Sequence, residues 1–335
     1  MQFLVIQTAF IGDVVLATGI VEKLHHHFPD AKIDFMLRKG NEGLLKGHPF
    51  LREVLVWDKK NGKMKNLLKL LRIVRSRKYD KIINVQRFAA TGMLTALSGA
   101  RETIGFDKNP FSRFFSRKVK HIISDGTVTR HEIERNNELI KDFTDSTIYK
   151  PRLYPAASDE AAVEAYQQTP YITISPASVW FTKQYPVDKW ISFLQRLTHP
   201  STVYLLGGPG DADMGDAIKA GAPNVTVVNL CGKLNFLQST ALMKKAVMNY
   251  VNDSAPMHFA SSVNAPVTAV YCSTLPSFGF GPLSDKRFVV EIEEPLPCRP
   301  CGLHGRATCP LGHFKCAYKI KEEQLLHSLS AGSHG

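Results

Sequence analysis

Short apolar runs alternate with helical patterns along almost the whole chain, and this alternation limits the possible folds more than any other feature. In the first half the strand-like runs are 3–6, 32–37, 53–56, 81–85 and 102–104, with helical patterns at 14–28, 64–75 and 131–143. In the second half the runs are 171–175, 203–206, 225–229, 248–252 and 267–271, with helical patterns at 187–197, 211–220, 236–245 and 255–262. Short apolar strands joined through helices are typical of parallel sheets covered by helices on both faces. The sequence therefore predicts an α/β fold.

The length of the chain favours two domains over one. At 335 residues the chain is long for a single hydrophobic core. Prolines 151 and 155 bracket an extended segment at 149–155, which is typical of a linker. We expect an N-terminal domain over 1–152, a second domain over 153–320, and a C-terminal helix and tail over 321–335.

The segment Asn-Asp-Ser-Ala-Pro-Met-His at 252–258 carries the strongest chemical signal. It follows a buried strand and opens a helix, so its first backbone N–H groups have no partners within the helix. Such donors, together with the positive end of the helix dipole, form a seat for a diphosphate. Asp253 and His258 would then lie at the rim of that seat. Taken alone, the segment fits equally well a helix capped by Asp253 or Ser254, with His258 in the core.

Two further loops have the same strand–loop–helix organisation. Gly12-Asp13 follows the first strand, at the start of the first helix. In the second half, the loop at 175–186 contains Ser175-Pro176, Lys183 and Tyr185-Pro186. In open α/β sheets, ligands gather beyond the carboxyl ends of the strands, and all three loops follow such ends.

These three segments together resemble glycosyltransferase family 9, the ADP-heptose:lipopolysaccharide heptosyltransferases. That family carries a Gly-Asp at the first strand–helix turn, a Ser-Pro…Lys…Trp/Tyr-Pro loop midway, and a late Asn-Asp-Ser-x-Pro-Met-His turn. The resemblance runs in order from about residue 1 to 320. It implies a GT-B architecture, with two facing doubly wound (Rossmann-like) domains and a cleft between them. The N-terminal domain would bind the acceptor, and the C-terminal domain the nucleotide sugar.

The resemblance also implies a reaction and a role for each motif. The expected activity is inverting transfer of a heptose or similar sugar from an ADP-sugar to a lipopolysaccharide core or other glycolipid, with no cofactor required for catalysis. Asp13 would be the general base, although Gly-Asp at a helix start can also be a simple cap. Lys183 would neutralise the departing diphosphate, the alternative being a surface lysine before a helix. Asp253 would hold sugar hydroxyls.

The remaining candidate site residues surround these three. On the donor side they are Ser175, Ser178, Thr182, Gly207, Gly208, Lys233, Ser254, Ala255, Met257 and His258. The hydroxyls would bond phosphate oxygens, the glycines would let the backbone approach the nucleotide, and the N–H groups around Ser254 and Met257 would meet the phosphates. On the acceptor side they are Gly12, Lys65, Arg72 and Arg113.

The formal net charge of +12 suggests an anionic partner. Lysines and arginines concentrate at 59–78, where Met64, Leu67, Leu68, Leu71 and Val74 fall at helical spacing and would face a core. The segment 109–118 interleaves cations with aromatics. This basic surface could be an ordinary solvated face, or could dock on an anionic membrane or grip a phosphorylated glycolipid. Nucleic-acid binding is disfavoured because no reader motif accompanies the charge.

Four cysteines, Cys298, Cys301, Cys309 and Cys316, form a compact array near the C-terminus. Such spacing could close a Zn²⁺ site or hold an iron–sulfur cluster, but it also fits free thiols or disulfides. Many members of the resembled family have a similar Cys-Pro-Leu-Gly-His segment, which is found here at 309–313. Because the family's chemistry is not thought to need a metal, any ion would be structural.

Competing function classes have weaker support. A dehydrogenase or epimerase should carry Gly-x-Gly-x-x-Gly after the first strand, and residues 8–12 do not match it. A related glycosyltransferase with a different nucleotide sugar, or a non-catalytic glycolipid-binding protein, remains an alternative. The apolar run at the N-terminus is too short for a signal peptide, and no run approaches the roughly 20 residues of a spanning helix. We expect a cytoplasmic protein that contacts the inner face of the membrane.

Overall fold

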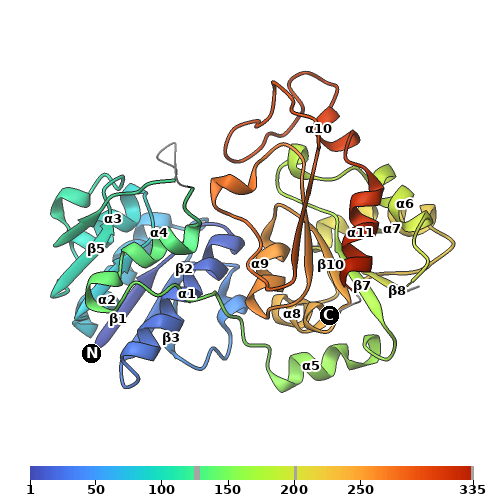
Figure 1. Ribbon diagram of the computed structural model, residues 1–335. Coiled ribbons are helices and arrows are strands. Elements are labelled where there is room, and N and C mark those ends of the chain that lie inside the picture. The colour runs from blue at the N-terminus through green and yellow to red at the C-terminus, as the bar shows by residue number, and fades with distance from the viewer. Residues whose placement is uncertain (124–128, 200–201, 333–335) are drawn as a thin grey trace. The chain divides into compact units, whose positions relative to one another are not determined.

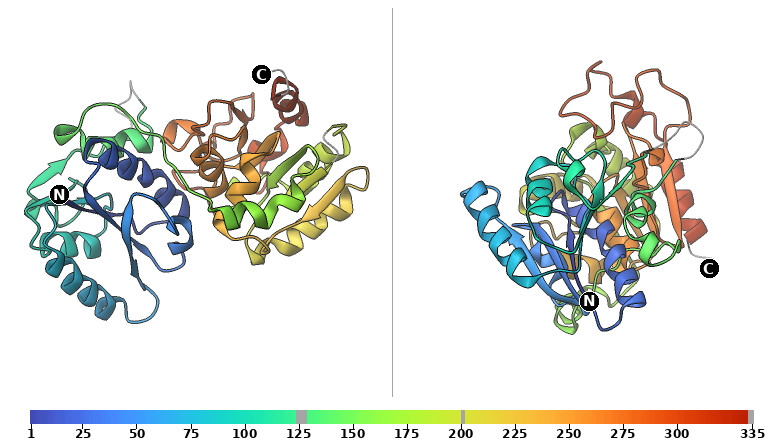
Figure 2. Two further views of the ribbon diagram at one scale, coloured as in Figure 1. Left: turned by 90° about the horizontal axis from the view of Figure 1, so that it is seen from below. Right: turned by 90° about the vertical axis from the view of Figure 1, so that its left-hand side faces the viewer.

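The computed structural model describes residues 1–123, 129–199 and 202–332 (Figure 1). The chain divides into two compact units, Met1–Tyr154 (unit 1) and Pro155–Gly335 (unit 2). Across the described ranges, none of the helices combines the length and apolar character that crossing a bilayer requires. Each unit is a parallel sheet with helices on both of its faces, as Figure 2 shows.

Unit 1 contains a sheet with the strand order β3-β2-β1-β4-β5-β6. Its strands are β1 Gln2–Ile6, β2 Lys32–Arg38, β3 Leu51–Trp57, β4 Lys81–Asn84, β5 Glu102–Phe106 and β6 Arg117–Val119. Its helices are α1 Ile11–His27, α2 Lys63–Arg77, α3 Ala89–Ala96 and α4 Glu132–Glu138. Leu4 and Ile6 pack toward α2 and α3, whereas Phe3, on the opposite face of the strand, meets Phe28 beyond α1. This alternation makes β1 buried on both faces.

Unit 2 repeats the arrangement with the strand order β12-β11-β10-β7-β8-β9. Its strands are β7 Tyr171–Ser175, β8 Thr202–Leu205, β9 Thr226–Asn229, β10 Met248–Asn252, β11 Val267–Tyr271 and β12 Arg287–Glu291. Its helices are α5 Ala157–Val163, α6 Val187–Gln195, α7 Ala212–Gly221, α8 Phe236–Lys244, α9 Ala255–Ser262, α10 Lys315–Tyr318 and α11 Glu322–Gly332. Helices α6, α7 and α11 cover one face, where Trp190 and Phe193 fill the core, and α5, α8 and α9 pack together elsewhere.

Both sheets are doubly wound, and each has a point where the strand order reverses. In unit 1 the chain builds outward from β1 through β2 to β3, and then returns to β4 on the other side of β1. In unit 2 it builds from β7 through β8 to β9, and then returns to β10 beside β7. The carboxyl ends of β1 and β4, and of β7 and β10, are therefore topological switch points, where open α/β sheets bind their ligands.

The structure adds elements that the pattern missed and shortens one that it predicted. The elements that were missed are strands β6 and β12 and helix α3. Both strands lie at a sheet edge, and the helix lacks a clear polar face. The helix predicted over 131–143 ends at Glu138, after which Leu139 and Ile140 bond to carbonyls three residues back, at 3.1 and 2.9 Å. The tighter turn that follows is a short 3₁₀ segment at Lys141–Phe143.

Helix α2 presents a different core stripe from the predicted one. Leu67, Leu70, Leu71 and Val74 are buried. Met64 and Leu68, which were expected to join them, are 51% and 49% exposed. They therefore lie on the outer surface of the helix, among its lysines and arginines.

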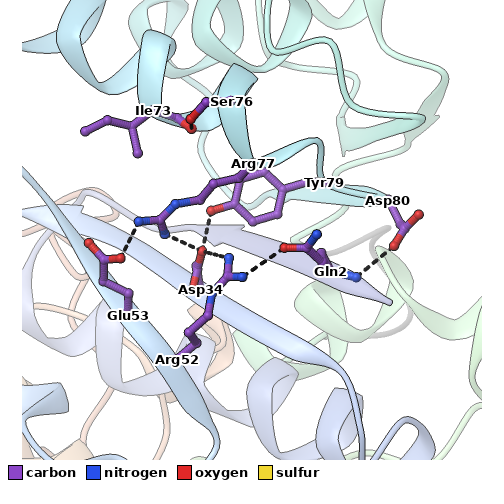
Figure 3. Close-up of polar contacts among 9 residues, drawn as sticks. All are labelled: Gln2, Asp34, Arg52, Glu53, Ile73, Ser76, Arg77, Tyr79 and Asp80. Carbon is purple, nitrogen blue, oxygen red and sulfur yellow. Dashed lines mark hydrogen bonds and ion pairs between the residues drawn. The ribbon is translucent and has the colours of Figure 1, made fainter.

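A buried ionic network ties the amino ends of the unit 1 strands together, away from the switch point (Figure 3). Asp34 of β2 is completely buried. Its carboxylate accepts two bonds from the Arg52 guanidinium, at 2.9 and 2.5 Å, one from Arg77 at 2.6 Å, and one from the Tyr79 hydroxyl. Arg77 also pairs with Glu53. Charge-assisted bonds on every side compensate the buried carboxylate, so this cluster is structural.

Candidate active site

The turn between β10 and α9 forms the centre of the unit 2 site. Ser254 is the N-cap of α9, in an extended conformation, and Pro256 lies in the first turn. The helix therefore starts as the sequence predicted, with its first N–H groups at the carboxyl end of β10. Asp253 sits between strand and helix, and its N–H bonds to Val270 O at 3.1 Å, which fixes the turn against β11.

Lys183 and Asp253, from two separate loops, form an ion pair at this turn. The Lys183 Nζ atom lies 2.7 Å from Asp253 Oδ2, and the two side chains are 15% and 10% exposed. Lys183 ends the 3₁₀ segment η5 (Phe181–Lys183), in the loop that follows β7. Because β7 and β10 are neighbours at the switch point, the pair lies where the topology predicts a ligand site.

Asn252, the first residue of the motif, holds the two loops together. Its Oδ1 atom accepts from the Tyr185 N–H at 2.9 Å, and its Nδ2 donates to Pro176 O at 2.7 Å. The side chain therefore joins both ends of the Ser-Pro…Lys loop to the end of β10. Sequence reasoning treated Asn252 only as a strand end, although an asparagine directly before the Asp was a signal for such a bridge.

The hydroxyl residues of the β7 loop differ in their surroundings. Thr182 is buried, and its Oγ1 atom accepts from Ser273 Oγ at 2.9 Å and from Arg306 N at 2.8 Å. Its oxygen is thus engaged as an acceptor within unit 2, which supports a positioning role for Thr182. Ser178 is half-buried. The Ser175 hydroxyl is buried, and it has no hydrogen-bond partner within the described parts of the chain.

The glycine turns after β8 and β9 lie side by side at the same edge of the sheet. Gly207 O accepts from Gly232 N at 2.9 Å, and Gly208 N donates to Asp211 Oδ2 at 2.7 Å. Gly232 has a φ of +74°, which a residue with a side chain rarely adopts. Lys233 follows it and is exposed.

His258, which the sequence placed at the rim of the diphosphate seat, is buried, as Asp253 is. It belongs to the first turns of α9 and is buried, like its neighbours Met257 and Phe259. The alternative of a histidine inside the domain therefore describes its placement better.

Thr274 is a unit 2 residue that sequence reasoning missed. Its Oγ1 atom donates to Asp253 Oδ2 at 2.7 Å, the oxygen that also meets Lys183. It follows the carboxyl end of β11 in the run Cys-Ser-Thr at 272–274. Polar residues directly after a strand were the signal used for the other loops, and the same rule would have found this one.

In unit 1, Asp13 occupies the third position of α1, directly after the switch-point strand β1. Its Oδ2 atom accepts from the Phe10 N–H at 3.2 Å, which is a capping arrangement. Burial, with a second contribution from the nearby Glu132 carboxylate, raises the pKa of Asp13 from 3.8 to about 6, against the lowering effect of the backbone bonds. A cap therefore coexists with a carboxyl group whose pKa lies close to neutral, as a general base requires.

The charged residues that act on Asp13 come from the loop after β4 and from the start of α4. Arg87, which follows β4, is exposed and opposes the rise in the pKa of Asp13. Glu132, the first residue of α4, pairs with Arg135 through two bonds of 2.9 and 2.5 Å. Burial, and then Arg87, lower the pKa of His121 to about 4. Sequence reasoning missed all four residues, because they are distant from Asp13 along the chain.

Aromatic and cationic side chains surround the same edge of unit 1. Phe10 is exposed, and the Arg38 guanidinium lies 5.1 Å from its ring centre. Lys59 Nζ donates to Thr8 O at 2.6 Å, and burial, with Arg38 and Lys63, lowers its pKa to about 8. Arg38 and Lys59 belong to the ends of β2 and β3, so cations converge on the carboxyl edge of the sheet.

The predicted acceptor-side residues lie on α2, in the loop after β5 and at the start of α1. Lys65 and Arg72 are on the exposed surface of α2. Arg113 lies in the 3₁₀ segment η2 (Ser112–Phe114), with its guanidinium 4.6 Å from the Phe114 ring centre. Gly12 is beside Asp13 at the start of α1.

The metal prediction finds no support in the geometry. Among the described residues, no group of three or more His, Cys, Asp or Glu side chains could hold a metal ion. The thiols of Cys298, Cys301, Cys309 and Cys316 are free. Burial, and then the thiols of Cys301, Cys309 and Cys298, raise the pKa of Cys316, so the four thiols lie near one another without forming a recognised ligand group.

The chain matches a family model described as glycosyltransferase family 9 (heptosyltransferase) over residues 67–305. It is 28% identical over 285 residues to lipopolysaccharide heptosyltransferase 3 of Escherichia coli, covering 79% of this chain and 82% of the relative. It is 23% identical over 283 residues to the lipopolysaccharide core heptosyltransferase OpsX of Haemophilus influenzae, covering 80% and 78%.

Solved structures share the fold over nearly the whole chain. A family 9 glycosyl transferase from Veillonella parvula superposes with a TM-score of 0.85 at 19% identity, covering 99% of this chain and 96% of that one. ADP-heptose LPS heptosyltransferase II of E. coli superposes with a TM-score of 0.79 at 20% identity, covering 99% and 98%. The two doubly wound units are thus those of a GT-B fold. The chain belongs to glycosyltransferase family 9, the heptosyltransferase family, and is a glycosyltransferase.

Proposed function

We propose that this enzyme transfers a heptose from an ADP-activated donor to the core sugars of a lipopolysaccharide precursor, with inversion at the anomeric carbon. The relatives it resembles are named for lipopolysaccharide. An E. coli heptosyltransferase with the same fold, WaaC, has been solved with ADP and with an ADP-heptose analogue. The observation that carries the proposal is the Lys183–Asp253 pair at the start of α9, which lies within the family match.

The donor would bind at the switch point of unit 2. The N–H groups that open α9, at Ser254 and Ala255, would bond the diphosphate together with the Lys183 ammonium. The buried Ser175 hydroxyl would find in a phosphate oxygen the partner that the described protein does not supply. The glycine turns at 207–208 and 232 would leave room for the nucleoside. Asp253 would bond a sugar hydroxyl.

The proposed chemical step gives each of these residues a role. An acceptor hydroxyl attacks the anomeric carbon, the bond from that carbon to the phosphate oxygen breaks, and ADP leaves with the electron pair. Lys183 and the α9 N–H groups stabilise the charge on the departing diphosphate. Asp13 takes the proton of the attacking hydroxyl. Its pKa of about 6 leaves it ionised at neutral pH yet able to accept a proton in the transition state.

The acceptor would bind along the carboxyl edge of the unit 1 sheet. Arg38, Lys59 and Arg87 supply positive charge around Asp13. Phosphate and carboxylate groups of a lipopolysaccharide core are the ligands that such guanidinium and ammonium groups favour. The family match begins at residue 67, so the assignment of Asp13 depends on its geometry and on its place after β1.

A direct assay tests this function. The purified protein is incubated with ADP-heptose and a heptose-deficient lipopolysaccharide, and ADP release and the mass of the acceptor are measured. We expect one heptose to be added per acceptor, and ADP-heptose to be preferred over UDP- and GDP-sugars. Transfer from only a UDP- or GDP-sugar would replace the donor assignment. Binding of the glycolipid without turnover of any nucleotide sugar would favour the non-catalytic alternative.

The same protein would dock on the inner face of the cytoplasmic membrane through α2. The outer surface of this helix carries Lys65, Lys69, Arg72 and Arg75 together with the exposed Met64 and Leu68, and the whole helix contains no acidic residue. Each cation near an anionic bilayer contributes about 1 kcal/mol, and the two apolar side chains can enter the interface.

Vesicle sedimentation tests the docking surface. We expect the wild type to sediment with phosphatidylglycerol-containing vesicles but not with pure phosphatidylcholine vesicles. Lys65→Glu/Lys69→Glu should abolish sedimentation. The matched control Lys219→Glu/Lys245→Glu, which makes the same charge change on exposed residues of unit 2, should retain it. Equal loss in both double variants would mean that net charge, rather than α2, determines binding.

A further inference from the structure

The Cys-rich part of unit 2, whose cysteines had suggested a metal site, makes its best-defined contacts with the donor loops. We refer to residues 298–306 as the strap. Its backbone and one arginine side chain reach the loop after β11 and the loop that carries Lys183. These contacts have no part in the function proposed above.

Arg299 fixes the loop after β11. Its Nε donates to Cys272 O at 2.8 Å, and its Nη2 donates to Thr274 O at 2.8 Å and to Tyr271 O at 3.2 Å. Glu291 of β12 accepts from the same Nη2 at 2.6 Å. The guanidinium is largely buried and therefore gathers three carbonyls of one turn around a single rigid group.

The strap also holds that loop and the β7 loop through its backbone. Cys301 N donates to Ser273 O at 2.9 Å. Arg306 N donates to Thr182 Oγ1 at 2.8 Å, while Thr182 N donates to Arg306 O at 3.1 Å. The Ser273 hydroxyl joins the two loops by donating to the same Thr182 oxygen.

A glycine allows the strap to come this close. Gly305 has a φ of +76°, and a Cβ atom placed on it would lie 2.9 Å from Lys183 Cγ. The strap therefore packs directly on the alkyl part of Lys183. Any larger residue at 305 would displace either the strap or the lysine.

These contacts converge on the Lys183–Asp253 pair. Thr274, whose backbone Arg299 holds, donates its hydroxyl to Asp253 Oδ2 at 2.7 Å. Asp253 Oδ2 in turn lies 2.7 Å from Lys183 Nζ. Thr182, which the strap holds from the other side, precedes Lys183 directly. Lys183 is thus held both at its backbone and at its ammonium group.

We propose that Thr274, Arg299 and Thr182 are positioning residues of the donor seat, through which the strap orients Lys183 and Asp253 toward the diphosphate. This inference rests on the proposed function, because it assumes that the pair faces a nucleotide sugar. It assigns to the strap a role in donor affinity and turnover. Pre-oriented charges of this kind lose less freedom when the ligand binds.

Matched substitutions at Thr274 separate positioning from simple stability. ADP affinity is measured by calorimetry, and kcat and the donor KM by ADP release, all well below the melting temperature of each variant. We expect Thr274→Val to weaken ADP binding about tenfold, because it removes one hydrogen bond to a charged group. Thr274→Ser, which keeps the hydroxyl, should stay within about twofold. Thr308→Val, the same change at an exposed threonine just beyond the strap, should equal the wild type.

Arg299→Lys provides an independent arm. It keeps the charge, but an ammonium cannot span the four acceptors of the guanidinium, so we expect ADP affinity to fall as in Thr274→Val. The proposal is overturned if Thr274→Val and Arg299→Lys both keep an ADP affinity and a kcat within twofold of the wild type. If Arg299→Lys does not fold, the comparison of Thr274→Val with Thr274→Ser still tests the proposal.

The outcomes distinguish this inference from the function on which it rests. A wild type that neither binds ADP nor uses an ADP-sugar overturns both. A wild type that binds ADP and transfers sugar, with Thr274→Val behaving like Thr274→Ser, overturns only the positioning role.

Discussion

Replacing Asp13 by asparagine should stabilise the protein while abolishing transfer. Raising the pKa of a carboxyl group from 3.8 to about 6 penalises its charged form by about 3 kcal/mol near pH 7. Solvent screening reduces that figure because the side chain is only half-buried, so we expect Asp13→Asn to gain about 1–2 kcal/mol. Asparagine can still accept the Phe10 N–H bond, so the cap survives the change.

The sign of the pH dependence follows from linkage. The folded protein binds the Asp13 proton more tightly than the unfolded chain does, because the folded pKa is the higher one. The raised pKa of Asp13 therefore costs the wild type no stability below about pH 4. The free energy of unfolding falls between about pH 4 and 6 and stays reduced above that range. The advantage of Asp13→Asn should be large near pH 7.5 and small near pH 4.

Calorimetric melting at the two pH values, with Asp13→Ala as the control, measures this effect. For a unit of about 150 residues, 1–2 kcal/mol corresponds to a rise in Tm of about 2–8 °C for Asp13→Asn near pH 7.5. Asp13→Ala loses the cap as well, so its free energy of unfolding should be about 1 kcal/mol lower than that of Asp13→Asn. If Asp13→Asn melts below the wild type near pH 7.5, the charge of Asp13 stabilises the fold and the reasoning is wrong.

Three further outcomes are expected. The value of kcat/KM should rise about tenfold per pH unit below about pH 6 and level off above it, as pH–rate profiles of transfer would show, because Asp13 must be ionised to act as the base. Lys183→Met should weaken ADP affinity measured by calorimetry by at least tenfold, because it removes the cation and leaves the Asp253 carboxylate unpaired; unchanged affinity would remove Lys183 from the site. Asp34→Asn should destabilise unit 1 by about 3–5 kcal/mol in urea unfolding, because two guanidinium groups lose their buried partner. Burial opposes the ionisation of Asp34, but bonds from Arg52 and its neighbours outweigh it and hold the pKa of this carboxyl below its usual value. The contribution of Asp34 to stability is thus present above the unfolded pKa of about 4 and is lost as the pH falls through the lower folded pKa. If Asp34→Asn loses as much stability in acid as the wild type does, this assignment is wrong.

The sequence predicted the central strands better than the edges. Strands β7, β10 and β11 have the predicted bounds, because a strand buried on both faces is a continuous apolar run with a sharp end. Strands β6 and β12 were missed because they lie at the edges of their sheets, where β6 is mostly cationic and β12 has a charged residue at each end. Helix α2 was found, but its buried stripe was shifted, because Met64, Leu68 and Leu70 all fit a helical period.

The unit 2 site was predictable where polar residues follow strands directly. Lys183 and Asp253 lie in loops after β7 and β10, and the order of the strands makes those loops neighbours. The role of Arg299 could not be predicted, since it depends on contacts with carbonyls 25 to 28 positions earlier in the chain. The metal prediction was not supported for a related reason: spacing between cysteines fixes no distance between their sulfur atoms.

The surroundings of Asp13 favour the proposed base over a simple cap. A carboxylate in the first turn of a helix normally has a lowered pKa, because the helix N–H groups and dipole stabilise its charge. Here the backbone bonds do act in that direction, but burial and the Glu132 carboxylate outweigh them. Glu132 is itself held in place by two bonds from Arg135, so the second negative charge is a built feature of α4. A raised pKa beside the switch-point strand is the arrangement expected where a carboxylate must bind a proton during turnover.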